Sequence, residues 1–281
     1  MVSQRKKIIV NSIVGLVVLF GVIFIGLGLH NKNQNKGQVG THNDEWPRIK
    51  SEKTITIGLD DTFVPMGFRD NSGKLVGFDI DLATQVFKDL GVTVKWQPID
   101  WSMKETELNT GNIDAIWNGY TATPERAQKV AFSNSYHRVT QVVVTLKKNN
   151  INSFADMSGK ILADQNSSSG DAELNAKPNI LKKYIKDNKA VGYDTFDKAF
   201  NDLNAGRIDG LLVDEDYARY YISHQDNADN YQIVKGDFSM TDDVVGFRKG
   251  DVGLQKAVNE QFSKLQKNGW ISDLEKKWFG Q

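Results

Sequence analysis

The sequence contains no cysteine. This absence excludes disulfide bonds, thiolate metal sites, a cysteine nucleophile and a lipid anchor attached to cysteine. Histidine is scarce, and none of the four histidines lies at a spacing typical of metal ligands: His30, His42, His137 and His224. No glycine-rich dinucleotide fingerprint follows a predicted strand. We therefore expect no metal site, no cofactor and no catalytic residue, and we interpret the acidic pairs Asp79/Asp81 and Asp242/Asp243 as helix caps and turns.

A basic surface is also missing. The chain carries 35 Lys and Arg against 35 Asp and Glu. Three of the basic residues, Arg5, Lys6 and Lys7, lie in the first 30 residues, which contain no acidic residue. The remainder therefore has 32 basic and 35 acidic residues. Without a large positive field, the protein is not expected to bind nucleic acid.

The longest apolar run spans residues 8–29 and is interrupted only by Asn11 and Ser12. As a helix it would reach about 33 Å, enough to cross a bilayer core of about 30 Å. Basic residues precede it, so we expect a cytoplasmic N-terminus and export of the rest. A cleaved signal peptide is the alternative, although the run exceeds the usual length of about 7–15 residues and no A-x-A site follows. We expect an anchor or signal segment at residues 1–30 and a polar, flexible linker at residues 31–52.

The remaining chain alternates strand-like and helix-like segments. Residues 54–58 alternate in polarity like a strand, and residues 92–96 are again strand-like. Between them, residues 79–90 have helical spacing, with Asp79 as a candidate N-cap and Gly91 as the stop. Such alternation is typical of α/β folds.

One pattern occurs twice, 95 residues apart: Leu108–Trp117 (LNTGNIDAIW) is echoed by Leu203–Leu212 (LNAGRIDGLL). Each copy reads as a helix end, a glycine C-cap and a buried strand, and Trp101 aligns with Phe196. The repeat predicts two similar lobes. Ligands of open α/β sheets bind beyond the carboxyl ends of strands. We therefore expect the segments after the two copies to line a cleft: Gly119–Thr121 and Asp214.

The segment from Thr121 to Arg126 (TATPER) reads as a loop that enters a helix. Thr123 suits the N-cap and Pro124 the first helical position. Arg126 then lies in the first turn, where a cation opposes the helix dipole. A ligand carboxylate would compensate, because guanidinium binds it bidentately and the helix end offers free N–H groups. A surface arginine, or one paired with an acidic residue, is the alternative.

Other polar segments also follow predicted strands. Ser167–Gly170 lies between a predicted strand at residues 160–163 and a helix, where hydroxyl and N–H groups suit either a carboxylate or an ordinary cap. Asp60 and Asp61 end the first strand and read as a turn on their own. Trp101 reads as either core or an aromatic wall.

Together these segments resemble the extracellular solute-binding proteins of polar amino acid ABC importers, the group that includes histidine- and glutamine-binding proteins. The matching stretches follow the family's order: Ile57–Pro65, Val76–Leu82, Gly119–Arg126, Val130–Ser133 and Lys277–Gly280. The resemblance implies a type II periplasmic-binding-protein-like α/β fold, in which two lobes joined by two crossing strands close on a free amino acid. We place lobe one at residues 53–143 and 240–281, and lobe two at residues 144–239.

The resemblance also implies how the amino acid backbone would be held. Arg126 would clamp the α-carboxylate, assisted by three hydroxyl residues: Thr121, Ser168 and Ser169. Asp214 would take the α-ammonium, together with the carbonyl of Gly119.

Four further residues are expected around the ligand side chain. Phe63 and Trp101 would flank it, and Asp60 and Gln165 would contact its end. A carboxylate at Asp60 repels an acidic side chain. We therefore expect glutamine or a basic amino acid (arginine, lysine or histidine), with cystine as the alternative because its second ammonium can also meet Asp60.

The implied function is a transport receptor that binds a free amino acid and docks on the permease subunits of an ABC transporter. It would be attached to the cytoplasmic membrane through residues 8–29, with its lobes outside the cell. A dehydratase-like enzyme is one alternative, but it needs a general acid or base beside the ligand, and no histidine lies in the pocket segments. A sensor domain is another, but it needs a cytoplasmic signalling module, and only about seven residues precede the apolar run.

Overall fold

The computed structural model describes residues 44–280. The apolar run at residues 8–29 and residues 31–43 of the expected linker lie outside the described residues. Within residues 44–280, no helix combines the length and apolar character needed to cross a membrane. The end of the expected linker differs from the prediction, because residues Trp46–Glu52 form helix α2. This helix is held to the fold by fully buried Ile49 and by Asp44, which accepts a hydrogen bond from the backbone N–H of Gly253 at 2.9 Å.

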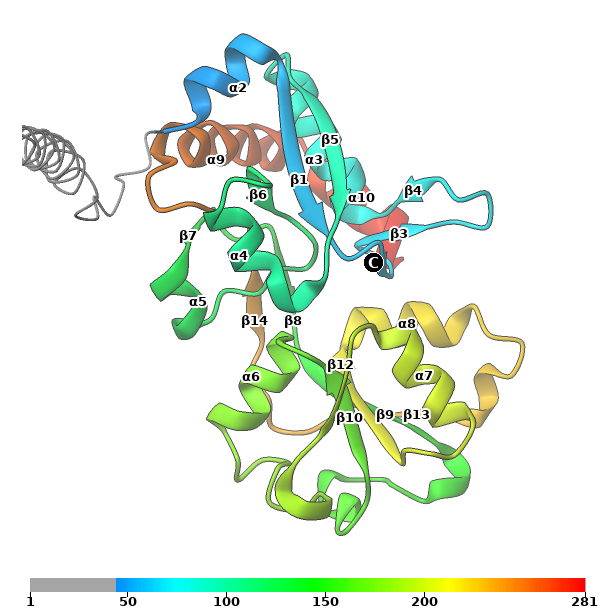
Figure 1. Ribbon diagram of the computed structural model, residues 1–281. Coiled ribbons are helices and arrows are strands. Elements are labelled where there is room, and N and C mark those ends of the chain that lie inside the picture. Colours follow the sequence, from blue (N-terminus) through cyan, green and yellow to red (C-terminus); the bar gives the residue numbers. More distant parts are fainter. Residues whose placement is uncertain (1–43, 281) are drawn as a thin grey trace, which may run out of the picture. The chain divides into compact units, whose positions relative to one another are not determined.

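Lobe one is built on a five-stranded sheet in the order β5-β1-β6-β15-β7 (Figure 1). The first three strands are parallel, and β15 is antiparallel to both of its neighbours. The strands are β1 (Thr54–Leu59), β5 (Thr93–Pro98), β6 (Ala115–Ile116), β7 (Ala131–Phe132) and β15 (Gly246–Phe247). The helices are α3 (Phe78–Asp89), α4 (Lys104–Asn109), α5 (Pro124–Lys129), α9 (Val252–Lys267) and α10 (Trp270–Phe279). A small antiparallel sheet follows β1 and contains β2 (Thr62–Phe63), β3 (Gly67–Arg69) and β4 (Leu75–Val76).

Lobe two is built on a second five-stranded sheet, in the order β11-β10-β12-β9-β13. Its strands are β9 (Gln141–Leu146), β10 (Leu162–Gln165), β11 (Val191–Tyr193), β12 (Gly210–Asp214) and β13 (Tyr231–Val234). Its α-helices are α6 (Ser169–Ala176), α7 (Phe196–Asn204) and α8 (Glu215–Ser223). Short 3₁₀ turns complete the described chain: η1 (Trp101–Met103) in lobe one, and η2 (Lys147–Asn149), η3 (Phe154–Met157), η4 (Lys186–Asn188) and η5 (Ala228–Asn230) in lobe two.

The two sheets share one topology, which confirms the prediction of two similar α/β lobes. In each sheet three parallel strands are followed by an antiparallel fourth strand. The sequence echo falls on equivalent elements, because Gly111 follows α4 with φ 82° and Gly206 follows α7 with φ 72°. Both glycines end their helix in the left-handed conformation that glycine adopts without strain. Trp101 and Phe196 begin η1 and α7, respectively.

Two antiparallel strands, β8 (His137–Val139) and β14 (Thr241–Asp243), carry the chain between the lobes (Figure 1). Each leads directly into the antiparallel fourth strand of the sheet that it enters, β9 after β8 and β15 after β14. The expected limit between residues 143 and 144 falls inside β9, which pairs with β12 from Gln141 to Thr145. Strand β9 lies between β12 and β13, and β15 lies between β6 and β7, so each crossing segment continues into an inner strand of the sheet that it enters.

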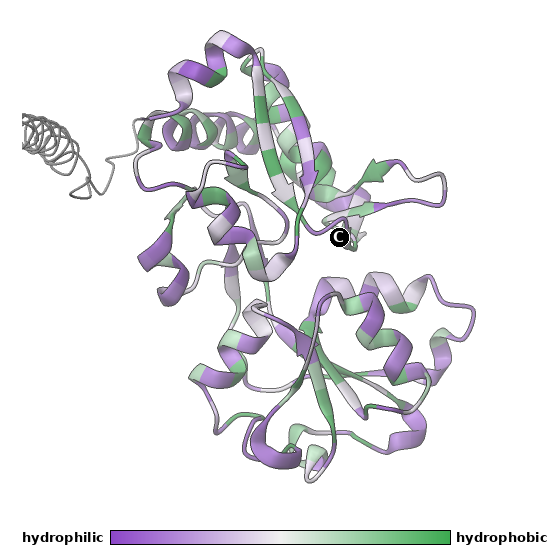
Figure 2. Ribbon diagram, in the orientation of Figure 1, coloured by the Kyte–Doolittle hydropathy of each residue, from purple (hydrophilic) through white to green (hydrophobic). Residues whose placement is uncertain are grey.

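Hydrophobic residues are concentrated in the strands and on the inner faces of the helices (Figure 2). All six residues of β9 are buried, as expected of a strand covered on both faces. Helix α3 buries Phe78, Leu82 and Val86, which lie one turn apart on a single face. This packing fixes the ends of β1, β6, β10 and β12, where the polar residues of the predicted site follow.

Candidate functional site

A small cavity lies where these four strands end. It is lined by residues of both lobes: Asp60, Phe63, Trp101, Asn118, Gly119, Arg126, Gln165, Ser168, Ser169, Phe196 and Asp214. The structure thus brings together every predicted site residue except Thr121. Asn118 and Phe196 line the cavity but were not predicted. Phe196 had a signal in the sequence, since the repeat aligns it with Trp101.

Arg126 lies in the first turn of α5, as predicted. Thr123 is the N-cap, and its hydroxyl accepts a hydrogen bond from the backbone N–H of Arg126 at 3.2 Å. The guanidinium is buried, stacks over the Tyr120 ring at 4.5 Å, and donates to the carbonyls of Thr121 (2.8 Å) and Ser167 (3.1 Å). Guanidinium has five N–H donors, so this geometry leaves donors for a carboxylate in the cavity.

Asp214 ends β12 and is 6 % exposed. Among residues 44–280, the one donor that reaches its carboxylate is the side-chain amide of Gln141, which also donates to Ser169 Oγ at 3.3 Å. Burial raises the pKa of Asp214 to about 6, and the neighbouring charge of Asp216 adds to this effect. The ionised carboxylate is therefore under-compensated, and a ligand ammonium would supply the missing positive charge.

Asp60 and Gln165 bind each other across the cavity. The Gln165 side-chain amide donates to Asp60 Oδ2 at 2.7 Å and to the carbonyl of Asp194 at 2.8 Å. The other oxygen of Asp60 accepts from the backbone N–H and hydroxyl of Thr62. Burial still raises the pKa of Asp60 above its usual range. A carboxylate has about four acceptor positions, so Asp60 can accept one more hydrogen bond from a ligand.

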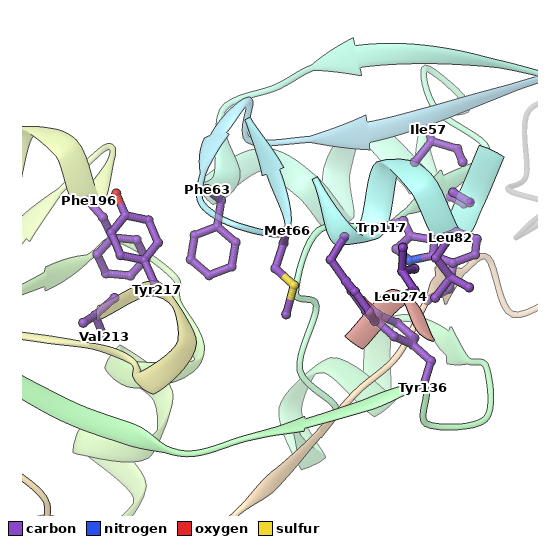
Figure 3. Close-up of a cluster of buried hydrophobic side chains, with 14 of the residues drawn as sticks. Ile57, Phe63, Met66, Leu82, Trp117, Tyr136, Phe196, Val213, Tyr217 and Leu274 are labelled. Carbon is purple, nitrogen blue, oxygen red and sulfur yellow. The ribbon is translucent and has the colours of Figure 1, made fainter. Parts of the chain in front are cut away.

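Three aromatic side chains line the cavity: Phe63, Trp101 and Phe196. Figure 3 shows Phe63 beside Phe196 and Tyr217 within a cluster of buried hydrophobic side chains. Phe63 of lobe one packs against Phe196 and Tyr217 of lobe two, with ring centroids 5.7 and 5.3 Å apart. Trp101 lies edge-on to Tyr120 at 6.1 Å. Phe63 and Trp101 therefore present apolar surface to the cavity, as expected of residues that flank a side chain.

Gly119 is fixed by Asp79, which we interpreted as a helix cap. That interpretation is wrong, because α3 begins after Gly77 and Asp79 is fully buried inside it. Asp79 Oδ2 accepts hydrogen bonds from the backbone N–H of Gly119 (2.7 Å) and from the Tyr136 hydroxyl (3.1 Å). Gly119 has φ +54°, and a Cβ atom there would lie 2.6 Å from the Phe63 ring. Glycine is therefore required at this end of the cavity.

Thr121 is placed differently from the expectation. Its side chain is fully buried, does not line the cavity and donates to Asp243 Oδ1 at 3.2 Å. Its contribution to the site is indirect, through the carbonyl that accepts from Arg126. Asp243 is not a turn residue, as we had interpreted it, but a fully buried residue of β14.

His137 on the crossing strand β8 interacts electrostatically with three buried carboxyl groups, those of Asp79, Asp214 and Asp243. Burial raises the pKa of Asp79 to about 7 and that of Asp243 well above its usual range, and His137 opposes both shifts. It also opposes the shift of Asp214. Burial alone would lower the pKa of His137, but its contact with Asp216 at 2.8 Å and the nearby Asp243 raise it to about 9. The raised pKa values favour the neutral, protonated forms of Asp79 and Asp243 near neutral pH, whereas His137 is favoured as a cation.

Comparison with known proteins gives one family. Residues 55–281 match the sequence model of the bacterial extracellular solute-binding proteins, family 3. The chain is 30 % identical over 272 residues to the L-cystine-binding protein TcyA of Bacillus subtilis (strain 168), covering 95 % of this chain and 97 % of that protein. It is 30 % identical over 233 residues to the lysine/arginine/ornithine-binding periplasmic protein of Escherichia coli (strain K12), covering 81 % and 88 %. A solved structure of an ABC uptake transporter substrate-binding protein from Streptococcus pneumoniae with bound histidine is 50 % identical, with a TM-score of 0.83 and coverage of 85 % and 97 %.

Proposed function

The chain belongs to the bacterial extracellular solute-binding proteins, family 3, and we propose that this solute-binding protein of an amino acid ABC importer captures a polar amino acid with a cationic or amide side chain. The class comprises histidine, arginine, lysine and glutamine. In the proposed pose Arg126 holds the α-carboxylate, with Ser168 and Ser169 nearby, and Asp214 holds the α-ammonium. The relatives are binding proteins rather than enzymes, and we propose that this chain likewise acts without catalysis.

The buried carboxylate of Asp60 is the observation that carries the proposed specificity. The carboxylate and ammonium of a bound amino acid would neutralise Arg126 and Asp214, which leaves Asp60 as the uncompensated charge in the cavity. Its pKa is raised by burial, so the site gains from a positive or hydrogen-bond-donating side chain beside it. A glutamate side chain would add a second buried negative charge, and burying two like charges is costly. The 50 % identical protein with bound histidine supports the basic members of the class.

The test is calorimetric titration of the wild-type protein and of the Asp60→Asn variant with a panel of amino acids. The panel contains histidine, arginine, lysine, glutamine, glutamate and cystine. We expect wild type to bind histidine, arginine, lysine or glutamine at least about tenfold more tightly than glutamate, because leaving one buried like-charge pair uncompensated costs more than about 1.4 kcal/mol. Asp60→Asn should reduce this preference, whereas Asp61→Asn should keep it, because Asp61 pairs with Arg69 at a partly exposed position. Arg126→Ala should bind none of the panel.

A preference of wild type for glutamate would overturn the proposed role of Asp60. Tightest binding of cystine would instead favour the second candidate, which the 30 % identity to a cystine-binding protein supports. In that case Asp60 would meet the second ammonium of cystine, and Asp60→Asn should still weaken binding.

The proposal includes the location of the protein. We propose that residues 8–29 attach the chain to the cytoplasmic membrane, with the two lobes on the extracellular face. The support is the length of the apolar run and the basic residues before it.

A further inference from the structure

Lys104 is a buried lysine that the ligand site does not use. It begins α4 in lobe one, is 1 % exposed and does not line the ligand cavity. Its ammonium donates to the carbonyl of Trp101 in its own lobe at 3.0 Å and to the carbonyl of Ser167 in lobe two at 3.0 Å. Glu105 Oε2 lies 3.6 Å from the same Nζ atom. Lys104 therefore bridges the lobes outside the cavity.

Ser167 presents its carbonyl to lobe one through an unusual backbone conformation. It is one of five non-glycine residues with positive φ among residues 44–280, at φ 59°. Ser167 is exposed, and its carbonyl accepts from both Lys104 and the Arg126 guanidinium. Two cations of lobe one thus share one acceptor of lobe two.

We propose that Lys104 is a latch residue, which stabilises the closed arrangement of the lobes through the Ser167 carbonyl and slows release of the amino acid without touching it. Opening the lobes breaks the bond to Ser167 but leaves the bond to Trp101 and the neighbouring Glu105, so the ammonium keeps partners in the open state. Burial and the nearby charge of Arg126 lower the pKa of Lys104 to about 7, so its ammonium form prevails below pH 7, where its hydrogen bonds are charge-assisted and roughly twice as strong as neutral ones. Loss of the bond to Ser167 acts mainly on the dissociation rate, because the association rates of related complexes vary little.

Lys129 offers a matched control. Like Lys104, it lines a hollow beside the ligand cavity, which shares Arg126 and Ser168 with that cavity. Its side chain is 47 % exposed and pairs with Glu125 within its own helix at 2.7 Å, and it makes no hydrogen bond or ion pair with lobe two among the described residues. Removing its charge changes the electrostatics of the same hollow but breaks no contact between the lobes.

The experiment compares full-length wild type, Lys104→Met, Lys104→Gln and Lys129→Met, purified in mild detergent. The first readout is the dissociation rate of radiolabelled histidine. The second is the fraction of molecules whose lobes are closed, measured by energy transfer between two fluorescent dyes, one on each lobe. Because the chain has no cysteine, exposed Lys88 and Lys186 can be changed to the only two cysteines and labelled. Lys104→Gln serves if Lys104→Met does not fold, because its shorter side chain cannot span to Ser167.

We expect the Lys104 variants to release histidine about tenfold faster, as for loss of a charge-assisted hydrogen bond, with an association rate within about twofold of wild type. Their closed fraction should fall with and without histidine, and Lys129→Met should match wild type. The proposal rests on the proposed function, but the dye measurement distinguishes failure of the proposed function from failure of the latch. If wild type binds no amino acid, the proposed function fails and the closed fraction without ligand still tests the latch. If wild type binds histidine, a Lys104 variant with an unchanged dissociation rate overturns the latch. If wild type binds no amino acid, a Lys104 variant with an unchanged closed fraction overturns it.

Discussion

At the scale of single residues, Asp214 makes ligand binding sensitive to pH. Its carboxyl group has a pKa of about 6 because of burial, and the ligand ammonium requires the ionised form. Affinity should therefore be constant above about pH 7 and fall by up to about tenfold per pH unit below pH 6, as protons compete with the ligand. Calorimetry with histidine or glutamine between pH 5 and 8 measures this slope.

Asp214→Asn provides the check on that assignment. The amide cannot ionise, so the variant should bind weakly at every pH and lose most of the decline below pH 6. Glutamine is the cleaner ligand, because its side chain does not titrate in this range. If the variant binds as tightly as wild type, or if its affinity falls as steeply below pH 6, a group other than Asp214 binds the ligand ammonium.

Single residues also mark the limit of what the sequence predicts. Gly119 and Asp214 could be found because they follow the two copies of the repeat, whereas the other predicted cavity residues were placed by the resemblance to the family. Asp79 and Asp243 could not, since a short-range pattern cannot distinguish a cap from a carboxylate that is buried by packing across the fold. The partner of Asp79 lies 40 residues away and that of Asp243 lies 122 residues away. Ser167, the acceptor for Lys104, is 63 residues distant.

At the scale of elements, the short helix α5 holds Arg126 in place. The helix has six residues, and the Thr123 hydroxyl caps the N–H of Arg126 itself. Thr123→Ala should lower the free energy of unfolding by about 1 kcal/mol, as for other lost caps. It should also weaken amino acid binding several-fold, because the capped residue is the proposed carboxylate ligand. Chemical denaturation and calorimetry measure the two effects separately.

Ser153→Ala is the matched control for the cap. Ser153 and Asp156 form a capping box on η3 in lobe two, away from the cavity. This variant should lose similar stability but keep wild-type affinity. If Thr123→Ala loses stability and binds normally, the cap does not position Arg126.

Several elements were predictable because their cues are local. Helix α3 follows from its spacing although its cap was misassigned, the loop into α5 follows from Thr123 and Pro124, and the two glycine-ended helices follow from the glycines of the repeat. Helix α2 was missed because its seven residues are mainly polar and because Asp44, which precedes it, bonds to the start of α9 about 200 residues later. The sheet of β2, β3 and β4 was missed because strands of two or three residues carry too little periodicity to read.

At the scale of the whole molecule, the described chain begins on lobe one, where Asp44 accepts from the N-terminal N–H groups of α9. A segment that crosses the membrane at residues 8–29 would therefore connect to lobe one. We expect the native protein to fractionate with membranes and to resist extraction by alkaline carbonate, with its lobes accessible to protease on intact spheroplasts. N-terminal sequencing that finds a mature chain beginning near residue 29 would contradict this expectation.

The chain passes from lobe one to lobe two through β8 and returns through β14. This path sets the order in which the two lobes can be completed during synthesis. Every sheet strand of lobe two lies between residues 141 and 234, so that sheet has all its strands once residue 234 is made. Lobe one starts earlier and ends later, because β15 at residues 246–247 sits between β6 and β7. Helix α10, which packs on α3, is made later still. The half of the protein that the ribosome begins is thus the half that it completes last.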